Sequence, residues 1–179
     1  MPRWRWLGAG MLALTWPGAV LACWDEAAAR YRINPDLLYA IARCESGLRP
    51  AVVNRSHRAR TGTYDIGLMQ VNSSHLARLG TFGITERELF EACTNIQVGA
   101  WILADNIQRH GFSWEAVGAY NAACTELKGS ACAAARSKYA WCVYRQLPKA
   151  STPGTGTPGP ASRTRAARVM PIIATRVGP

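Results

Sequence analysis

Apolar residues recur with the period of an α-helix over most of residues 23–148, and the pattern stops at glycine, proline and asparagine. Between 48 and 63 the period is lost, which predicts a loop with at most a small β-ribbon. A capping box at 85–88 opens a short helix. Further helices are predicted at 24–32, 35–46, 95–109, 114–121 and 131–147, and from a cap at Asn72 or Ser73 to Leu79. The chain is therefore predicted to be mainly α.

The helix predicted at 95–109 differs from the others because apolar residues cover most of its circumference. Ile96 and Leu103 share one side, while Val98 and Trp101 lie on much of the remainder. A helix of this kind is normally buried at the centre of a domain. We therefore expect this helix to be central.

Clear signals bound the helix at 35–46. Asn34 is a favourable N-cap, and Pro35 suits the first helical position. Gly47 supplies the left-handed residue that commonly ends a helix. We therefore expect the helix to begin and end at these positions.

Glu45 continues the apolar face of this helix into its last turn, because Leu37, Ile41 and Glu45 are spaced i, i+4 and i+8. We expect its carboxyl group at the wall of a pocket. The negative end of the helix dipole and partial burial both disfavour the ionised form, so the pKa of Glu45 should be raised. A carboxyl group that stays protonated near neutral pH can act as a general acid.

The two ends of the chain differ in composition from its middle. Residues 1–22 have a positively charged N-terminal region, an apolar stretch and small residues before a cleavage site. This pattern predicts a secretory signal peptide and a periplasmic mature protein. The apolar stretch is too short for a comfortable membrane span. Residues 149–179 are rich in Pro, Gly and Thr and then in Arg, which predicts a disordered tail. The folded domain is expected at 23–148, as a monomer.

Charge argues against a nucleic-acid partner, although the formal net charge is +10. Residues 23–148 hold 14 Lys and Arg against 11 Asp and Glu, a net charge of +3, and the remaining positive charge belongs to the two ends. The arginines of the folded part form no defined helix face, as a nucleic-acid site would require.

Six cysteines follow the predicted cleavage site, and an even number in an exported chain favours disulfides. The three histidines are not spaced as zinc ligands, and no cofactor motif is present. Six cysteines allow 15 pairings, among which the sequence does not choose. Our hypothesis pairs Cys23 with Cys93 and Cys124 with Cys132, which leaves Cys44 and Cys142 by elimination. It fails if Cys23 carries the lipid of an outer-membrane lipoprotein, an alternative suggested by a loose resemblance of 20–23 to a lipoprotein cleavage box.

Three short motifs are specific when they are taken together. They are Glu45-Ser46-Gly47, Gly67-Leu68-Met69-Gln70-Val71-Asn72 and Ala119-Tyr120-Asn121-Ala122. In this order and spacing the chain resembles the lytic transglycosylases of the soluble, lysozyme-like (SLT) family, in particular the small versions that accompany conjugation and specialised secretion systems. The resemblance covers roughly 23–147.

The resemblance implies a lysozyme-like α fold and a cleft that binds the glycan strands of peptidoglycan. It further implies cleavage of the β-1,4 bond between N-acetylmuramic acid and N-acetylglucosamine, with formation of a 1,6-anhydro ring. Components of an envelope-spanning apparatus are implied as partners. Glu45 matches the catalytic acid of the family.

The other matched residues are implied to bind or position the substrate. Ser46 would position the substrate or the glutamate, Tyr120 would approach the Glu45 carboxylate, and Asn121 would hydrogen-bond a sugar substituent. Gly67 permits close approach of the backbone. The remaining residues expected to line the cleft are Leu68, Met69 and Gln70, and core packing is the alternative for Leu68 and Met69.

Two other functions stay open at this point. A hydrolytic muramidase would use Asp65 as the partner carboxylate of Glu45, although Asp65 is expected in a turn where its ordinary role is to cap a backbone amide. A catalytically inactive wall-binding protein could use the same cleft. The products released from peptidoglycan distinguish these possibilities.

Overall fold

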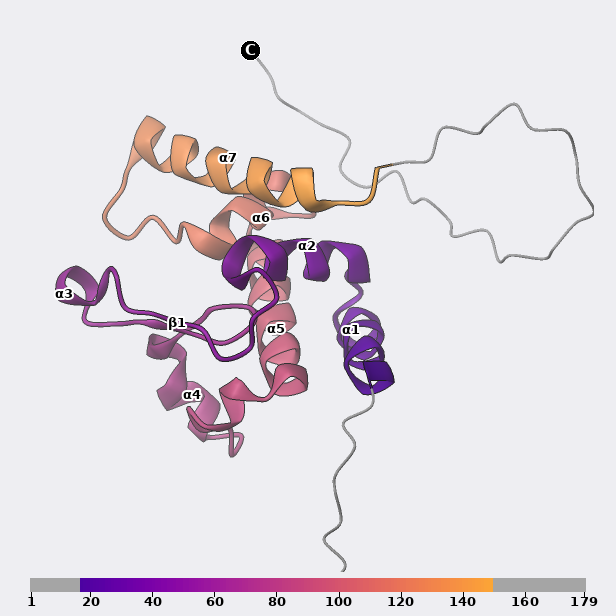
Figure 1. Cartoon of the computed structure of the whole chain (residues 1–179). Helices are drawn as coiled ribbons and strands as arrows, with labels where there is room; N and C mark the ends of the chain where they lie inside the picture. The colour runs from indigo at the N-terminus through magenta and orange to yellow at the C-terminus, as the bar shows by residue number, and fades with distance from the viewer. Residues whose placement is uncertain (1–16, 150–179) are drawn as a thin grey trace, which may run out of the picture.

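The structure is a computed structural model that describes residues 17–149. Most of the predicted signal peptide and nearly all of the predicted tail therefore lie outside the described residues. The longer helices are α1 (Pro17–Tyr31), α2 (Pro35–Ser46), α5 (Ala92–His110), α6 (Trp114–Asn121) and α7 (Gly129–Gln146), and α4 (Leu76–Gly80) and α3 (Arg58–Thr61) are short (Figure 1). Two 3-10 helices cover Ser73–His75 and Glu88–Phe90.

The predicted mainly α class is confirmed, and α2 has the predicted bounds. Asn34 accepts a hydrogen bond from the Asp36 amide at 2.8 Å, and Gly47 ends the helix in the left-handed conformation. Other ends shift by a few residues. Helix α5 begins at Ala92 because the chain turns into it directly from the 3-10 helix, and α1 begins at Pro17, so it continues across the predicted cleavage site.

Helix α5 is central, as its apolar circumference predicts. Its Ile96 and Leu103 pack in the larger core cluster with α1, α2, α6 and α7. On another side Val98 packs in a smaller cluster beneath the β-sheet. Figure 1 shows α5 between these two parts of the molecule.

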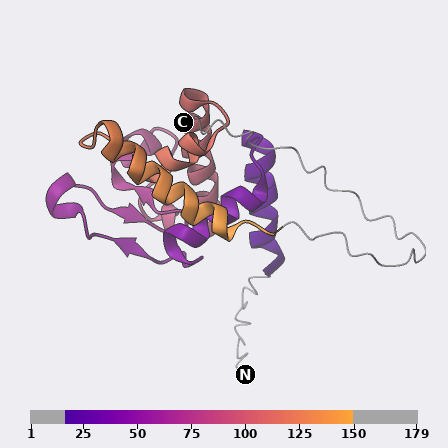
Figure 2. The same cartoon turned by 90° about the horizontal axis from the view of Figure 1, so that it is seen from above.

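A three-stranded antiparallel sheet interrupts the helices. Its strands are β1 (Val53–Asn54), β2 (Asp65–Ile66) and β3 (Val71–Asn72), in the order β1-β2-β3. Helix α3, which the sequence did not predict, lies between β1 and β2 at the far end of the hairpin (Figure 2). The expectation of a turn at Asp65 is wrong, because this residue lies in β2.

The disulfides agree with the hypothesis drawn from the sequence. Cys23 is bonded to Cys93, Cys44 to Cys142, and Cys124 to Cys132. The first joins α1 to α5, and the second joins the C-terminal end of α2 to α7. Within residues 17–149, no helix has the length and apolar character needed to cross a membrane.

Candidate functional site

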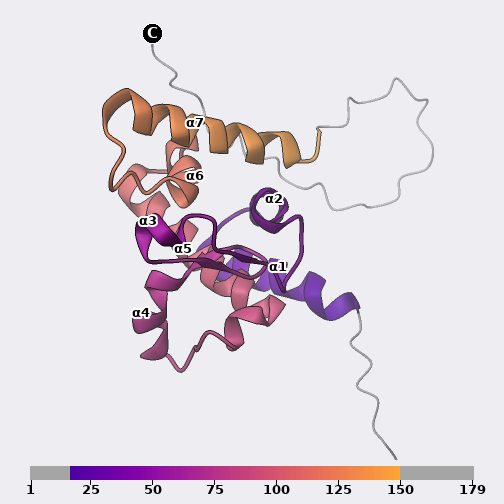
Figure 3. The same cartoon turned by 60° about the vertical axis from the view of Figure 1, so that its left-hand side comes forward.

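A cleft of about 910 Å³ separates the sheet and α3 from the start of the α6–α7 connection. Figures 1 and 3 show these two regions on the same side of the molecule. Most of the cleft lining is polar, and Glu45, Gln70, Tyr120 and Asn121 are the residues expected from the sequence that line it, together with Asp65. A cleft of this volume is in the range of ligand-binding sites.

Glu45 lies in the last turn of α2, at the wall of the cleft as predicted. Its pKa is raised from 4.5 to about 7, and burial is the largest cause because it disfavours the ionised carboxylate. The negative charge of Asp65 raises the pKa further, whereas hydrogen bonds from Tyr139 and Asn121 lower it. Glu45 is therefore protonated in a large fraction of molecules at neutral pH and can donate that proton.

Tyr139 is the contact to Glu45 that the sequence analysis missed. Its hydroxyl donates a hydrogen bond of 2.6 Å to Glu45 Oε1 from the middle of α7. A signal for it existed in the sequence: Tyr139 lies one helical turn before Cys142, and Cys142 bonds to the residue that precedes Glu45. The disulfide therefore brings the tyrosine and the glutamate to the same place.

Burial and the negative charge of Glu45 both raise the pKa of the Tyr120 hydroxyl, so Tyr120 lies near Glu45 as expected. Its hydroxyl donates to the carbonyl oxygen of Met69 at 2.9 Å instead of to Glu45. Its ring stacks on that of Tyr139, with centroids 6.4 Å apart and an angle of 12° between the planes. Tyr120 thus holds both the Tyr139 ring and the segment that carries Gln70.

The turn 67–70 places only one of its four expected residues in the cleft. Leu68 and Met69 are buried in the core, and Gly67 packs against the interior instead of a ligand. A Cβ on Gly67 would lie 2.4 Å from Asn95 Nδ2, and φ is +78° there. Gly67, Leu68 and Met69 therefore do not line the cleft, and Leu68 and Met69 take the place in the core that was the other possibility for them. The backbone has positive φ at both ends of this tight turn, at Gly67 and at Gln70.

Gln70 reaches the cleft but has limited hydrogen-bonding capacity left. Its Nε2 donates to the carbonyl oxygens of Val52 at 3.1 Å and Gly67 at 2.8 Å. The carbonyl end of its amide remains to accept a hydrogen bond from a ligand.

Asn95 is a second residue that the sequence analysis missed. It is fully buried, accepts from the Met69 amide, and donates to the carbonyl oxygens of Ile66 and Leu89. The signal was an asparagine on a helix otherwise apolar over most of its circumference, because a buried amide requires partners. Asn95 therefore fixes the backbone of the turn 67–70 from its buried side.

Ser46 is buried and does not line the cleft. Its hydroxyl donates to the carbonyl oxygen of Leu68 at 2.7 Å and accepts from the Arg49 amide at 3.1 Å. It therefore ties the end of α2 to the turn and positions Glu45, the other role considered for it.

Three polar side chains face the cleft in register across the sheet. Asp65 pairs with Asn54 on β1 and with Asn72 on β3. Both amides donate to its carboxylate, at 3.4 Å from Asn54 Nδ2 and 2.7 Å from Asn72 Nδ2. His57 Nδ1 lies 3.6 Å from the same carboxylate. Asp65 is thus a fixed negative charge that faces the cleft and acts on Glu45.

Comparisons with known proteins were made against families, curated sequences and solved structures. The family model described as "Transglycosylase SLT domain" matches residues 22–139. The invasion protein IagB of Salmonella typhi is 44% identical over 130 residues, which are 72% of this chain and 79% of IagB. The protein IpgF of Shigella flexneri is 39% identical over 125 residues, which are 69% of this chain and 78% of IpgF.

A solved structure shares the fold. An inactive mutant of the lytic transglycosylase Slt from Pseudomonas aeruginosa superposes with a TM-score of 0.54 at 22% identity. The match covers 75% of this chain and spans 24% of that much longer chain. The likeness therefore establishes the arrangement of the helices and the sheet.

Proposed function

Because the chain belongs to the SLT transglycosylase family, we propose that it cleaves the β-1,4 bond between N-acetylmuramic acid and N-acetylglucosamine in peptidoglycan, forming a 1,6-anhydro ring. The observation that carries this proposal is a glutamate, Glu45, that lies at the wall of a polar cleft and has a pKa of about 7. Such a group donates and accepts a proton at neutral pH with little cost in either direction.

In the proposed reaction, Glu45 transfers its proton to the oxygen that leaves C1 of the muramic acid. The C6 hydroxyl of the same sugar then attacks C1 and gives its proton to the Glu45 carboxylate, so no water is consumed. Intramolecular attack removes much of the entropic barrier, because the nucleophile is already attached to the substrate. One carboxyl group therefore serves as acid and then as base.

The neighbours of Glu45 have supporting roles in this proposal. Tyr139 orients the carboxyl group through Oε1, and Asn121 and Gln70 offer polar groups to the sugar substituents. Asp65 stabilises the positive charge that develops on the sugar ring in the transition state.

The reaction products test the proposal directly. The mature protein, incubated with purified peptidoglycan, should release muropeptides that end in anhydromuramic acid and are lighter by one water than hydrolysis products. Mass spectrometry of the released fraction measures this difference. Products with a reducing end would instead establish a hydrolase, and intact peptidoglycan after incubation with folded, oxidised protein would reject both reactions.

Hydrolysis is a second candidate because one observation favours it. Asp65 lines the same cleft, is held by two amides of the sheet, and raises the pKa of Glu45 through its charge, as the second carboxylate of a hydrolase would. If reducing ends appear, Asp65→Asn should remove them. If anhydro products appear, the same variant should slow their formation without changing their chemistry.

The pH dependence should report the pKa of Glu45. Activity should fall about ten-fold per pH unit above pH 7, because the proton donor is lost as Glu45 ionises. Tyr139→Phe removes a hydrogen bond that favours the carboxylate, so the pKa of Glu45 should rise. The alkaline limb of the pH profile, where activity falls, should then move to higher pH. Asp65→Asn removes a charge that disfavours the carboxylate, so the limb should move to lower pH.

Rate–pH profiles of the three proteins provide the measurement, and circular dichroism at each pH excludes unfolding as the cause. Two variants that shift the limb in the same direction, or an alkaline limb that neither variant moves, would contradict the assignment of this limb to Glu45.

We also propose export to the periplasm and local opening of the wall for an envelope-spanning apparatus. The Cys23–Cys93 disulfide supports a mature protein without lipid, because the sulfur of Cys23 is already bonded. Similarity to a protein named as an invasion protein supports a task at the bacterial surface. In a strain without redundant wall lyases, deletion of the gene should impair assembly of one such apparatus, and unchanged assembly of all of them would reject this role.

A further inference from the structure

Charge of a single sign gathers in the last third of the chain. Residues 127–179 contain nine Lys and Arg and no Asp or Glu, a net charge of +9. Residues 23–126 contain ten Lys and Arg against eleven Asp and Glu, a net charge of −1. Five of the nine basic residues lie in the described part of the chain, from Lys128 to Lys149. Helix α7 therefore carries positive charge that no acidic residue of its own balances.

One face of α7 points away from the cleft and from the core. Successive residues of an α-helix are about 100° apart, so Trp141 lies about 200° around the helix from Tyr139, whose hydroxyl bonds the cleft glutamate. Trp141 and Tyr144 are 57% and 52% exposed. Lys138 and Arg145 are also exposed, at helical spacing from Trp141. We call Lys138, Trp141, Tyr144 and Arg145 the outer face of α7. In Figures 1 and 3, α7 lies along the top of the molecule, with α2 and α6 beneath it.

Ring contacts fix the aromatic side chains of the outer face. The Tyr144 ring lies edge-on to Trp141, with centroids 5.4 Å apart, and edge-on to Trp114 of α6, with centroids 5.6 Å apart. Trp114 is partly buried and packs against the larger core cluster. The three rings therefore form a continuous aromatic surface that is anchored to the core and half exposed at its outer edge. Surfaces of this kind are typical of interaction sites.

The basic groups of the outer face are available to a partner. Within residues 17–149, neither Lys138 nor Arg145 forms an ion pair. Glu115, at the start of α6, is bonded to Arg136, which lies on another side of α7. The outer face thus presents two cations and two aromatic rings without a carboxylate of α7 to neutralise them.

This combination is complementary to the surface of an anionic bilayer. Tryptophan and tyrosine rings are favoured at the level of the lipid headgroups, and Lys and Arg side chains beside them reach the phosphates. The four arginines of residues 150–179 add charge of the same sign. Interfaces between proteins pair positive with negative groups, whereas 53 residues without one acidic side chain suit an extended surface of a single, negative sign.

We propose that the outer face of α7 docks the protein on an anionic lipid bilayer. Trp141 and Tyr144 lie at the level of the headgroups in this arrangement. Lys138 and Arg145 contact the lipid phosphates. Because Tyr139 points to the opposite side of α7, the docked protein directs its cleft away from the bilayer. This inference does not depend on the proposed reaction, since binding to lipid is measured without peptidoglycan.

Co-sedimentation of the mature protein with lipid vesicles tests the proposal. The protein should bind vesicles of phosphatidylcholine and phosphatidylglycerol mixed at about 2:1, less strongly as salt is added, and should not bind phosphatidylcholine alone. Lys138→Gln/Arg145→Gln should weaken binding by about 25-fold, because each basic residue near an anionic surface contributes about five-fold.

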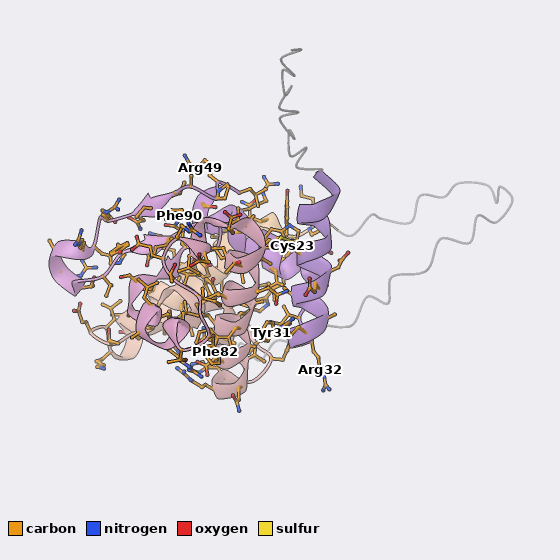
Figure 4. The ribbon with its side chains drawn as sticks, turned by 90° about the horizontal axis from the view of Figure 1, so that it is seen from below. Cys23, Tyr31, Arg32, Arg49, Phe82 and Phe90 are labelled. Carbon is orange, nitrogen blue, oxygen red and sulfur yellow. A yellow bond between two sulfur atoms is a disulfide. The ribbon has the colours of Figure 1, made fainter. Side chains whose placement is uncertain are left out.

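The matched control is Arg32→Gln/Arg87→Gln, which removes the same charge from exposed positions outside α7. Arg32 follows α1, which lies on the far side of α2 from α7 in Figures 1 and 3, and Figure 4 shows its side chain pointing away from the helices. This pair should bind the mixed vesicles within about two-fold of the unaltered protein. Circular dichroism should show that both pairs of substitutions leave the fold intact.

Each outcome of the sedimentation experiment decides the question. A loss specific to the outer-face pair supports docking through α7. Equal losses in the two pairs would show attraction by net charge alone, and no loss in the outer-face pair would place the contact elsewhere; both overturn the inference. Binding to soluble polyglutamate as tight as binding to the vesicles would overturn it too, because the partner would then be an acidic polymer instead of a bilayer.

The fluorescence of Trp141 provides a second measurement. Addition of the mixed vesicles should shift the tryptophan emission of the unaltered protein to shorter wavelength, because the exposed indole leaves water for the headgroup region. Trp141→Phe should still bind the vesicles and lose most of this shift. A full shift in the Trp141 variant would show that another tryptophan enters the bilayer, which contradicts the proposed orientation.

Discussion

Replacement of Glu45 with glutamine should lower the rate of muropeptide release by about 10³-fold or more, because glutamine cannot donate the proton that the proposed reaction transfers from Glu45 to the leaving oxygen. Glutamine has the same shape and accepts the hydrogen bond from Tyr139, so the fold should be retained. The measurement is the yield of anhydromuropeptides over time, determined by mass spectrometry.

Two controls separate loss of chemistry from loss of structure. Glu26→Gln changes an exposed glutamate on α1 and should leave the rate within about two-fold, as surface substitutions usually do. Sedimentation with insoluble peptidoglycan should show that the Glu45 variant still binds. Activity above one-tenth of the original rate in the Glu45 variant would assign the acid to another residue.

Removal of the Cys44–Cys142 disulfide should lower the stability of the protein. It should also lower activity more than removal of either other disulfide does. A cross-link that closes a loop of about 100 residues contributes ~4.7 kcal/mol in the chain-entropy description, and the separation here is 98 residues. The same bridge joins the residue before Glu45 to the residue one turn after Tyr139, so its loss also loosens the 2.6 Å contact between them. Urea unfolding and the rate at low temperature measure the two effects for Cys44→Ala/Cys142→Ala.

The Cys124–Cys132 pair provides the control, because it closes a loop with a separation of only 8 residues. Its replacement by alanine should cost ~2–3 kcal/mol at most in the same description, and it should leave the Glu45–Tyr139 contact intact. Comparable losses of activity in the two double variants, at a temperature where both are folded, would show that the Cys44–Cys142 bridge does not position the site.

Local signals predicted most of the helices well. Helix α2 has the predicted bounds because its N-cap, its first-turn proline and its terminal glycine act within a few residues of one another. The central place of α5 follows from its apolar circumference. Helix α3 and the strands are short and irregular, and their positions depend on pairing between segments, so the sequence predicted only a small β-ribbon there.

The motif around Gly67 shows where a sequence pattern stops being informative. Of the four residues of this motif that were expected to line the cleft, Gly67 to Gln70, only Gln70 does so. A tight turn with φ of +78° at Gly67 and +50° at Gln70 decides which side chains point inward, and that turn is held by Asn95, 25 residues or more along the chain. No local pattern specifies such a contact.

The sequence by itself determined that the chain is mainly helical, that six cysteines follow the predicted cleavage site, and that Glu45 ends an apolar helix face beside a cleft. These features depend on periodicity, caps and burial, which are encoded within one or two helical turns. Only the tertiary structure decided that Tyr139 contacts Glu45, that Ser46 and Asn95 fix the turn 67–70, and that Asp65 faces the cleft. Each of these contacts joins residues distant in the chain, and their geometry is set by how the helices and the sheet pack together.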